Sequence, residues 1–200
     1  MIVIYTNYDD VTEILETFAL QFIVLAGSAI TLDLGPPDDS ISTNIQVQLG
    51  GPTKSVFFFG HGRLHLSALE AQDEVPAIDG QNLHLLRDRL VYAACCDSTV
   101  ILDPAVKKHN ATVIGYNDKL RVPLGGRYRA LMENCVLAGA RALLSGQDAG
   151  DARKGIQQEF RLTAQQLIGT GRVRDAVMSV KVFDWNANIA ALNGNPSRTI

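Results

Sequence analysis

Two uninterrupted apolar runs constrain the fold of this chain most strongly. Val-Phe-Phe-Phe at residues 56–59 leads into His61, and Leu-Val-Tyr-Ala-Ala at residues 90–94 leads into Cys95. A continuous apolar run of this length is typical of a strand buried on both faces of a parallel sheet. Because sites in open α/β sheets form at the carboxyl ends of the strands, we expect His61 and Cys95 to meet at one edge of the sheet. An imidazole beside a thiol is the arrangement of a cysteine nucleophile and its base.

The residues next to this pair carry further information. Gly60 and Gly62 flank His61, and glycines both ease a tight turn and let another part of the backbone approach closely. A histidine packed in a core does not need that setting, so we interpret His61 as a functional side chain. Cys96 follows Cys95 directly. Successive residues of a strand point to opposite faces, so only one of the two thiols can face His61, and the position favours Cys95.

The rest of the chain alternates strand-like and helix-like segments, which predicts an α/β fold with a mainly parallel central sheet and a helical C-terminal part. A loop signal falls at residues 35–40, and residues 41–49 fit either a strand or a crossover helix. Helix N-caps are predicted at Asp10, at Asp79, and at either Asp97 or Ser98. The remaining predicted elements are strands at 2–6, 29–34 and 111–116, a hairpin within 64–78, helices at 10–21, 79–87, 98–109, 128–144, 151–168 and 173–185, and a short final strand within 189–196.

Length and composition suit one α/β domain spanning residues 1–200. A hydrophobic share of 46% is that of an ordinary globular protein, and a net charge of −3 argues against nucleic acid or an anionic membrane as a partner. No apolar run is long enough to cross a bilayer, and the N-terminal residues do not form a signal peptide. Three cysteines, two of them adjacent, make no disulfide framework, which predicts a cytoplasmic protein.

The two runs resemble those of the caspase-type cysteine peptidases, a group that includes caspases, metacaspases, legumain, gingipains, separase and CHAT-domain proteases. In that group a hydrophobic strand ends in His-Gly, as at residues 58–62 here, and the next strand ends in Ala-Cys followed by a small or acidic residue, as at residues 93–98. The order of the segments through residue 118 also matches, and residues 191–196 are similar to the Gly-Asp-Pro close of CHAT and gingipain relatives. The resemblance covers residues 50–145 best.

This resemblance implies a caspase-hemoglobinase-like three-layer sandwich and a cysteine endopeptidase with His61 and Cys95 as its dyad. Backbone N–H groups near Gly62 and Cys95 would then hold the oxyanion. No metal or organic cofactor takes part in such a reaction, and the partners are a protein substrate and an activating protease or regulatory partner. A calcium requirement is left open. Bacterial relatives of this kind often act in stress or phage (antiviral) defence.

Substrate preference in this group depends mainly on the first specificity pocket, where acidic residues select Arg or Lys. Asp97 lies just past the nucleophile and Asp118 just past the next predicted strand, and no arginine occurs between residues 90 and 119. We therefore expect cleavage after basic residues, with Asp118 as the better candidate. The alternatives are that Asp97 only caps a helix and that Asp118 is a solvated loop charge.

Two other classes of protein compete with the peptidase. A catalytically inactive binding or scaffold module could share the fold. A flavodoxin-like ligand-binding protein is disfavoured because no glycine-rich phosphate loop follows the first strand. A zinc site built from His61, Cys95, Cys96 and another histidine is also disfavoured, because the sequence has no Cys-x-x-Cys spacing to support it.

Overall fold

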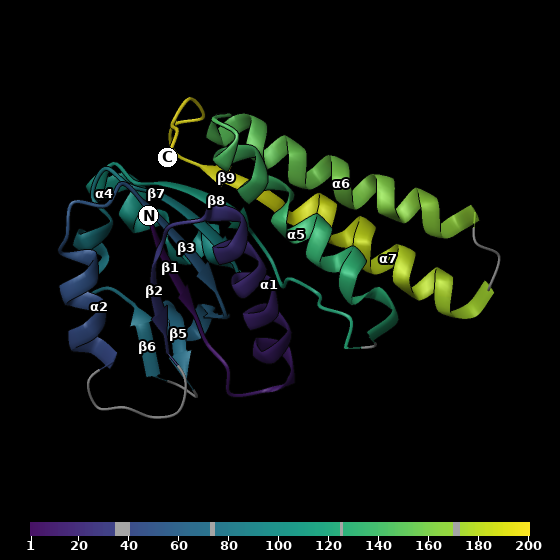
Figure 1. Cartoon of the computed structure of the whole chain (residues 1–200), viewed down its shortest axis with the longest axis horizontal. Helices are drawn as coiled ribbons and strands as arrows, with labels where there is room; N and C mark the ends of the chain where they lie inside the picture. The colour runs from purple at the N-terminus through teal and green to yellow at the C-terminus, as the bar shows by residue number, and fades with distance from the viewer. Residues whose placement is uncertain (35–40, 73–74, 125, 170–172) are drawn as a thin grey trace.

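A six-stranded, mainly parallel sheet forms the centre of the computed structural model (Figure 1), which describes residues 1–34, 41–72, 75–124, 126–169 and 173–200. The strand order is β2-β1-β3-β7-β8-β9, and only β9 at one edge runs antiparallel to its neighbour. The strands are β1 (Ile2–Tyr5), β2 (Ile30–Asp33), β3 (Ser55–Phe59), β7 (Leu90–Ala94), β8 (Thr112–Tyr116) and β9 (Ala190–Asn193). The predicted α/β fold with a mainly parallel sheet is confirmed.

The two apolar runs are the central strands of this sheet. Every residue of β3 and β7 is buried, and the two strands pair in parallel with Phe59 opposite Ala94. Alternate residues point to opposite faces. Phe57, Phe59, Tyr92 and Ala94 therefore lie in one core cluster, while Val56, Phe58, Val91 and Ala93 lie in the other. This burial on both faces explains why the runs contain no polar residue.

Helices cover both faces of the sheet and make three layers. One face carries α1 (Asp10–Ala26), α5 (Arg129–Leu144), α6 (Ala149–Gly169) and α7 (Val173–Ile189), and the other carries α2 (Ile41–Leu49), α3 (Ser98–Ile101) and α4 (Asp103–His109). The segment that fitted either a strand or a helix is thus helix α2, and the predicted 98–109 helix is split just before Pro104. The helix expected to begin at Asp79 is shorter, a 3₁₀ turn η2 (Leu83–Leu86). The predicted loop at 35–40 lies outside the described residues.

The C-terminal part is helical, as predicted. In Figure 1, α6 and α7 lie side by side and extend together beyond the sheet. The chain then returns as β9, which pairs with β8. Among the described residues, no helix is long and apolar enough to cross a membrane.

A second, three-stranded sheet stands at the carboxyl end of β3. It contains β4 (His61–Arg63), β5 (Ala68–Gln72) and β6 (Val75–Ile78), all antiparallel, with the 3₁₀ turn η1 (Leu64–Leu66) between β4 and β5. This confirms the predicted hairpin within 64–78. His61 is its first residue, so the small sheet holds the imidazole at the edge of the large one.

Candidate functional site

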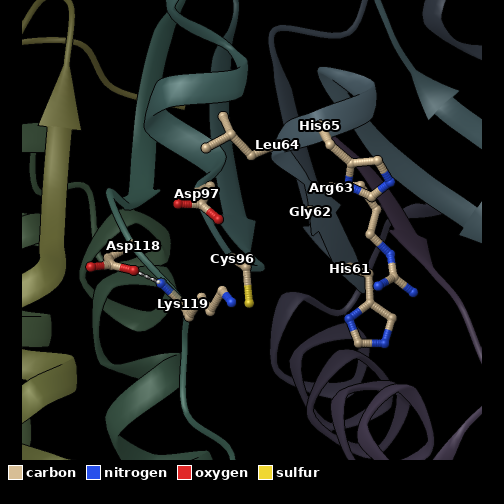
Figure 2. A pocket seen from close by; sticks show the side chains of 9 residues that line it. All are labelled: His61, Gly62, Arg63, Leu64, His65, Cys96, Asp97, Asp118 and Lys119. Atoms are coloured by element: carbon tan, nitrogen blue, oxygen red, sulfur yellow. Dashed lines mark hydrogen bonds between the residues drawn. The ribbon is translucent and has the colours of Figure 1, made fainter.

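A cavity of about 730 Å³ opens at the carboxyl ends of the central strands (Figure 2). One wall comes from β4 and η1 and contains His61, Gly62, Arg63, Leu64 and His65. The other wall is the chain that leaves β7 and β8, and it contains Cys96, Asp97, Asp118 and Lys119. The structure therefore brings together four of the five predicted site residues: His61, Gly62, Asp97 and Asp118.

Cys95 is the exception. Its side chain is 1% exposed and lies in the core cluster under α2, α3 and α4, on the same face as Val91 and Ala93. Burial raises the pKa of the Cys95 thiol well above its ordinary value. The expectation that Cys95 faces His61 is therefore corrected: the alternation of the strand turns the Cys95 side chain into the core, and Cys96 is the thiol that lines the cavity.

Cys96 and His61 lie on the same face of the sheet. Cys96 packs against the core cluster that holds Phe59 and Ala94, and His61 contacts Asp9 at the N-cap of α1, the helix that covers that same face. Figure 2 shows the two side chains on opposite walls of the cavity. The Cys96 Sγ donates a long hydrogen bond of 3.8 Å to the Leu120 carbonyl, and no hydrogen bond joins it to His61 within the described part of the chain.

Asp9, which no sequence motif singled out, orients His61. The His61 Nε2 lies 2.8 Å from the Asp9 Oδ2. An ionised carboxylate can only accept hydrogen bonds, so Nε2 carries the proton and Nδ1 is left as the basic nitrogen. Asp9 is also the N-cap of α1, where its Oδ1 accepts from the N–H groups of Val11 and Thr12, so the cap lies one residue before the predicted one, Asp10.

The charge of Asp9 is stabilised by these contacts. Burial by itself would raise the pKa of Asp9, but hydrogen bonds from Thr12 and His61 together lower it below its ordinary value. The carboxylate is therefore ionised at neutral pH and available to the imidazole.

A buried glutamate supports the wall that carries His61. The Glu70 carboxylate on β5 accepts hydrogen bonds from the Tyr8 hydroxyl at 2.7 Å and from the Arg63 Nε at 2.6 Å. The Tyr8 ring in turn lies 5.6 Å from the His61 ring, centroid to centroid. These contacts connect the segment between β1 and α1 to the small sheet beside His61.

Gly62 is a close-approach position. A Cβ added there would lie 1.9 Å from the carbonyl oxygen of Cys96, so any side chain would push the two walls apart. The predicted close backbone approach is confirmed for Gly62. The backbone of neither Gly60 nor Gly62 lies in the left-handed region, so proximity and not an unusual turn is what requires glycine at Gly62.

Asp97 and Asp118 lie near each other because the Asp97 N–H donates to the Asp118 carbonyl, at 3.1 Å. Burial, together with the charge of Asp118, raises the pKa of Asp97. Asp97 adopts a left-handed backbone, with φ at 53°, and its side chain makes no capping hydrogen bond to α3. The reading of Asp97 as only a helix cap is therefore not supported, and its carboxylate borders the cavity (Figure 2).

The loop after Asp118 is fastened to α7. The Lys119 carbonyl accepts from the Trp185 Nε1 at 3.0 Å, and Arg121 exchanges two backbone hydrogen bonds with the Asn186 side chain. The Arg121 guanidinium also lies 4.2 Å from the centroid of the Trp185 ring. This anchoring positions Lys119 on the cavity wall.

Neither family models, nor curated proteins, nor solved structures gave a match to this chain. The site must therefore be interpreted from its own geometry. Among the described residues, no group of three or more His, Cys, Asp or Glu side chains is arranged to hold a metal ion. Of the other histidines, His65 lines the cavity, whereas His84 is an exposed residue of η2.

Proposed function

We propose that this protein is a cysteine endopeptidase of caspase type, in which His61 and Cys96 form the dyad. The observation that carries the proposal is that both side chains border one cavity at the ends of β3 and β7, with Asp9 orienting His61. The resemblance of residues 50–145 to that group and the three-layer α/β architecture support it. The nucleophile is moved from Cys95 to the neighbouring thiol because only Cys96 is accessible.

The protonation state of the Cys96 thiol before reaction determines whether His61 must act as a base. Burial raises the pKa of Cys96 and the charge of Asp97 raises it further, while the Lys119 ammonium acts in the opposite direction. The thiol is therefore protonated at neutral pH and needs a base. Nδ1 of His61 is the nitrogen that can take its proton.

The reaction then proceeds in two halves. Cys96 Sγ transfers its proton to His61 and forms a bond to the carbonyl carbon of the scissile peptide, whose oxygen becomes an oxyanion facing the N–H groups around Gly62. His61 gives the proton to the amine as the C–N bond breaks, leaving a thioester on Cys96. Water, deprotonated by His61, hydrolyses the thioester and restores the thiol. Asp9 holds the imidazole in the required tautomer throughout.

Two carboxylates favour a basic residue before the scissile bond. Asp97 and Asp118 border the cavity next to Cys96, and a cationic side chain between them would offset the burial and the Asp118 charge that raise the pKa of Asp97. Lys119 lies at the same wall and offsets part of this charge. We therefore infer a preference for Arg or Lys, with Asp118 and Asp97 as the selecting groups.

The test is cleavage of fluorogenic peptides carrying Arg, Lys or Asp before the reporter, with and without calcium. We expect cleavage of the Arg and Lys peptides, complete loss in Cys96→Ala and in His61→Ala, and retained activity in Cys95→Ala, which serves as the matched control. Activity that persists in Cys96→Ala but not in Cys95→Ala would overturn the assignment of the nucleophile.

A non-catalytic binding module is the second candidate, and one observation favours it. The Cys96 thiol is hydrogen-bonded to the Leu120 carbonyl and not to His61. A module of this kind would bind a basic peptide in the same cavity without cleaving it. Peptide binding by fluorescence anisotropy, unchanged in Cys96→Ala and accompanied by no cleavage under any condition, would establish this candidate in place of the enzyme.

A further inference from the structure

A second cavity, of about 600 Å³, lies at the amino ends of β3 and β7, the opposite ends of these strands from His61 and Cys96. Its walls come from three segments that are distant in sequence: residues 51–54 before β3, residues 87–89 before β7, and residues 197–199 after β9. Three separate segments thus converge on one polar space that the proposed peptidase reaction does not use.

The charge of this cavity is opposite to that of the chain as a whole. Lys54, Arg87, Arg89 and Arg198 line it, against the single carboxylate of Asp88. Four positive groups and one negative group give a formal charge of +3, in a chain whose net charge is −3. Such a concentration of one sign in a concave site attracts anions.

Arg89 contributes a buried charge that lacks an acidic partner. Its residue is 7% exposed, and its guanidinium donates to the hydroxyl of Thr53 at 3.1 Å and to the carbonyls of Leu49 and Gly51 at 2.5 Å and 2.7 Å. All three acceptors are neutral, and no ion pair to Arg89 is found in the described part of the chain. Because a buried cation without a counter-charge is costly, a bound anion would stabilise it.

Arg198 supplies a second, independent indication. Its Nη1 is buried and has no hydrogen-bond partner among the described residues. The turn that carries it is held by the backbone, since the Arg198 carbonyl accepts from the Ala149 N–H at 2.9 Å and the Arg198 N–H donates to the Asn195 carbonyl at 3.3 Å. Buried polar groups in native proteins are almost always hydrogen-bonded, so this nitrogen of a cavity-lining arginine is available to donate to an anion.

The carboxylate of Asp88 does not supply that acceptor. Its Oδ1 accepts a hydrogen bond from the Asn110 side chain at 2.7 Å, and the described residues show no ion pair between Asp88 and either arginine. The positive charge of the cavity is therefore left for a ligand.

We propose that this cavity binds a small, multiply charged anion bearing phosphate groups. Guanidinium groups match phosphate oxygens in charge and geometry, and the hydroxyls of Ser197 and Thr199 add further donors. The described residues of the lining include no aromatic side chain on which a nucleobase could stack, so the phosphate groups would provide the recognition. The proposal does not depend on the peptidase assignment, because the site shares no residue with the cavity of His61.

The test measures binding of pyrophosphate and of inorganic phosphate to the intact chain by isothermal titration calorimetry, at an ionic strength kept constant with sodium chloride. We expect saturable binding, tighter for pyrophosphate than for phosphate because it carries more charge. Arg198→Gln should weaken pyrophosphate binding at least tenfold. Lys54→Gln, at an exposed position whose loss does not disturb the core, should weaken it severalfold. Arg161→Gln, which removes an exposed arginine of α6 outside this cavity, is the matched control and should bind as the wild type does.

Three results would overturn the proposal. The first is no heat of binding beyond that of a chloride-matched blank. The second is pyrophosphate binding by Lys54→Gln and Arg198→Gln that equals that of the wild type. The third is an equal weakening in Arg161→Gln, which would mean that the anion senses only overall surface charge. An ATP titration in parallel shows whether a nucleotide can present the same groups, and the expected affinity for it is no higher than for pyrophosphate.

Discussion

Asp9 has two roles that can be separated by two substitutions. As the N-cap of α1 it accepts hydrogen bonds from the N–H groups of Val11 at 3.1 Å and Thr12 at 2.8 Å, and as the partner of His61 it accepts from Nε2 at 2.8 Å. Asparagine caps helices about as well as aspartate, but it brings no negative charge to the imidazole. Asp9→Asn therefore removes the second role and keeps the first, whereas Asp9→Ala removes both.

The structure sets the size of each effect. Loss of the cap in Asp9→Ala should cost about 1 kcal/mol of the free energy of unfolding, a fall of roughly 2–4 °C in Tm for a chain of this size. The contact between Asp9 and His61 is partly solvated, since the side chains of His61 and Asp9 are 17% and 42% exposed. Solvent screening then limits it to about 1 kcal/mol. If the interaction between Asp9 and His61 stabilises the transition state by this amount, its loss lowers kcat about five- to tenfold.

The assays are thermal unfolding followed by circular dichroism and steady-state cleavage of an Arg-reporter peptide. We expect Asp9→Asn to keep the wild-type Tm and KM but to lose most of its kcat, and Asp9→Ala to lose both kcat and stability. If Asp9→Asn instead retains full kcat, the carboxylate serves only as a helix cap and the tautomer argument for His61 fails.

Three further outcomes follow from the same site. The midpoint of the pH dependence of Cys96 alkylation by iodoacetamide should move to higher pH in Lys119→Met, because an ammonium that lowers the thiol pKa is lost. It should move to lower pH in Asp97→Asn, because a charge that raises the thiol pKa is lost. Equal midpoints in both variants would contradict these charge effects. Gly62→Ala should lower the free energy of unfolding in urea by about 1–3 kcal/mol and abolish cleavage, because its Cβ would collide with the Cys96 carbonyl; a fully active Gly62→Ala would rule out the close approach. Cys95→Ala should lose about 1 kcal/mol of stability by leaving a small cavity in the core, with cleavage retained, and an unchanged Tm would mean that this thiol is not packed.

Much of the fold could be predicted from the sequence because the pattern of burial is local. The buried runs at 56–59 and 90–94 became β3 and β7, and the apolar spacing in 128–144 became α5, starting one residue later at Arg129. A short segment of mixed polar and apolar residues was harder to predict. Residues 41–49 carry alternating apolar positions that fit a strand, yet they form α2, because the parallel connection from β2 to β3 has to cross the face of the sheet.

The site divides in the same way. Its position at the carboxyl ends of β3 and β7 was determined by the sequence alone, since two buried parallel strands that end in His and Cys must place them at one edge. The choice between Cys95 and Cys96 as the thiol that faces His61 was not determined by the sequence. It depends on the register of β7 against β3, and a shift of one residue exchanges the two faces. In the structure Cys96 packs on the α1 side of the sheet, where His61 contacts Asp9, whereas Cys95 lies in the core on the opposite side.

The partner of His61 also required the tertiary structure. The sequence pattern placed the cap at Asp10, and only the path of the chain from β1 into α1 decides that Asp9 caps the helix and reaches the imidazole 52 residues away. The sequence by itself thus determined an α/β sheet with an imidazole and a thiol at one edge. Only the packing of segments distant in the chain decided which thiol and which carboxylate lie at the site, and only that packing formed the cationic cavity at the far ends of the same strands. Contacts of that kind leave no local pattern in the sequence.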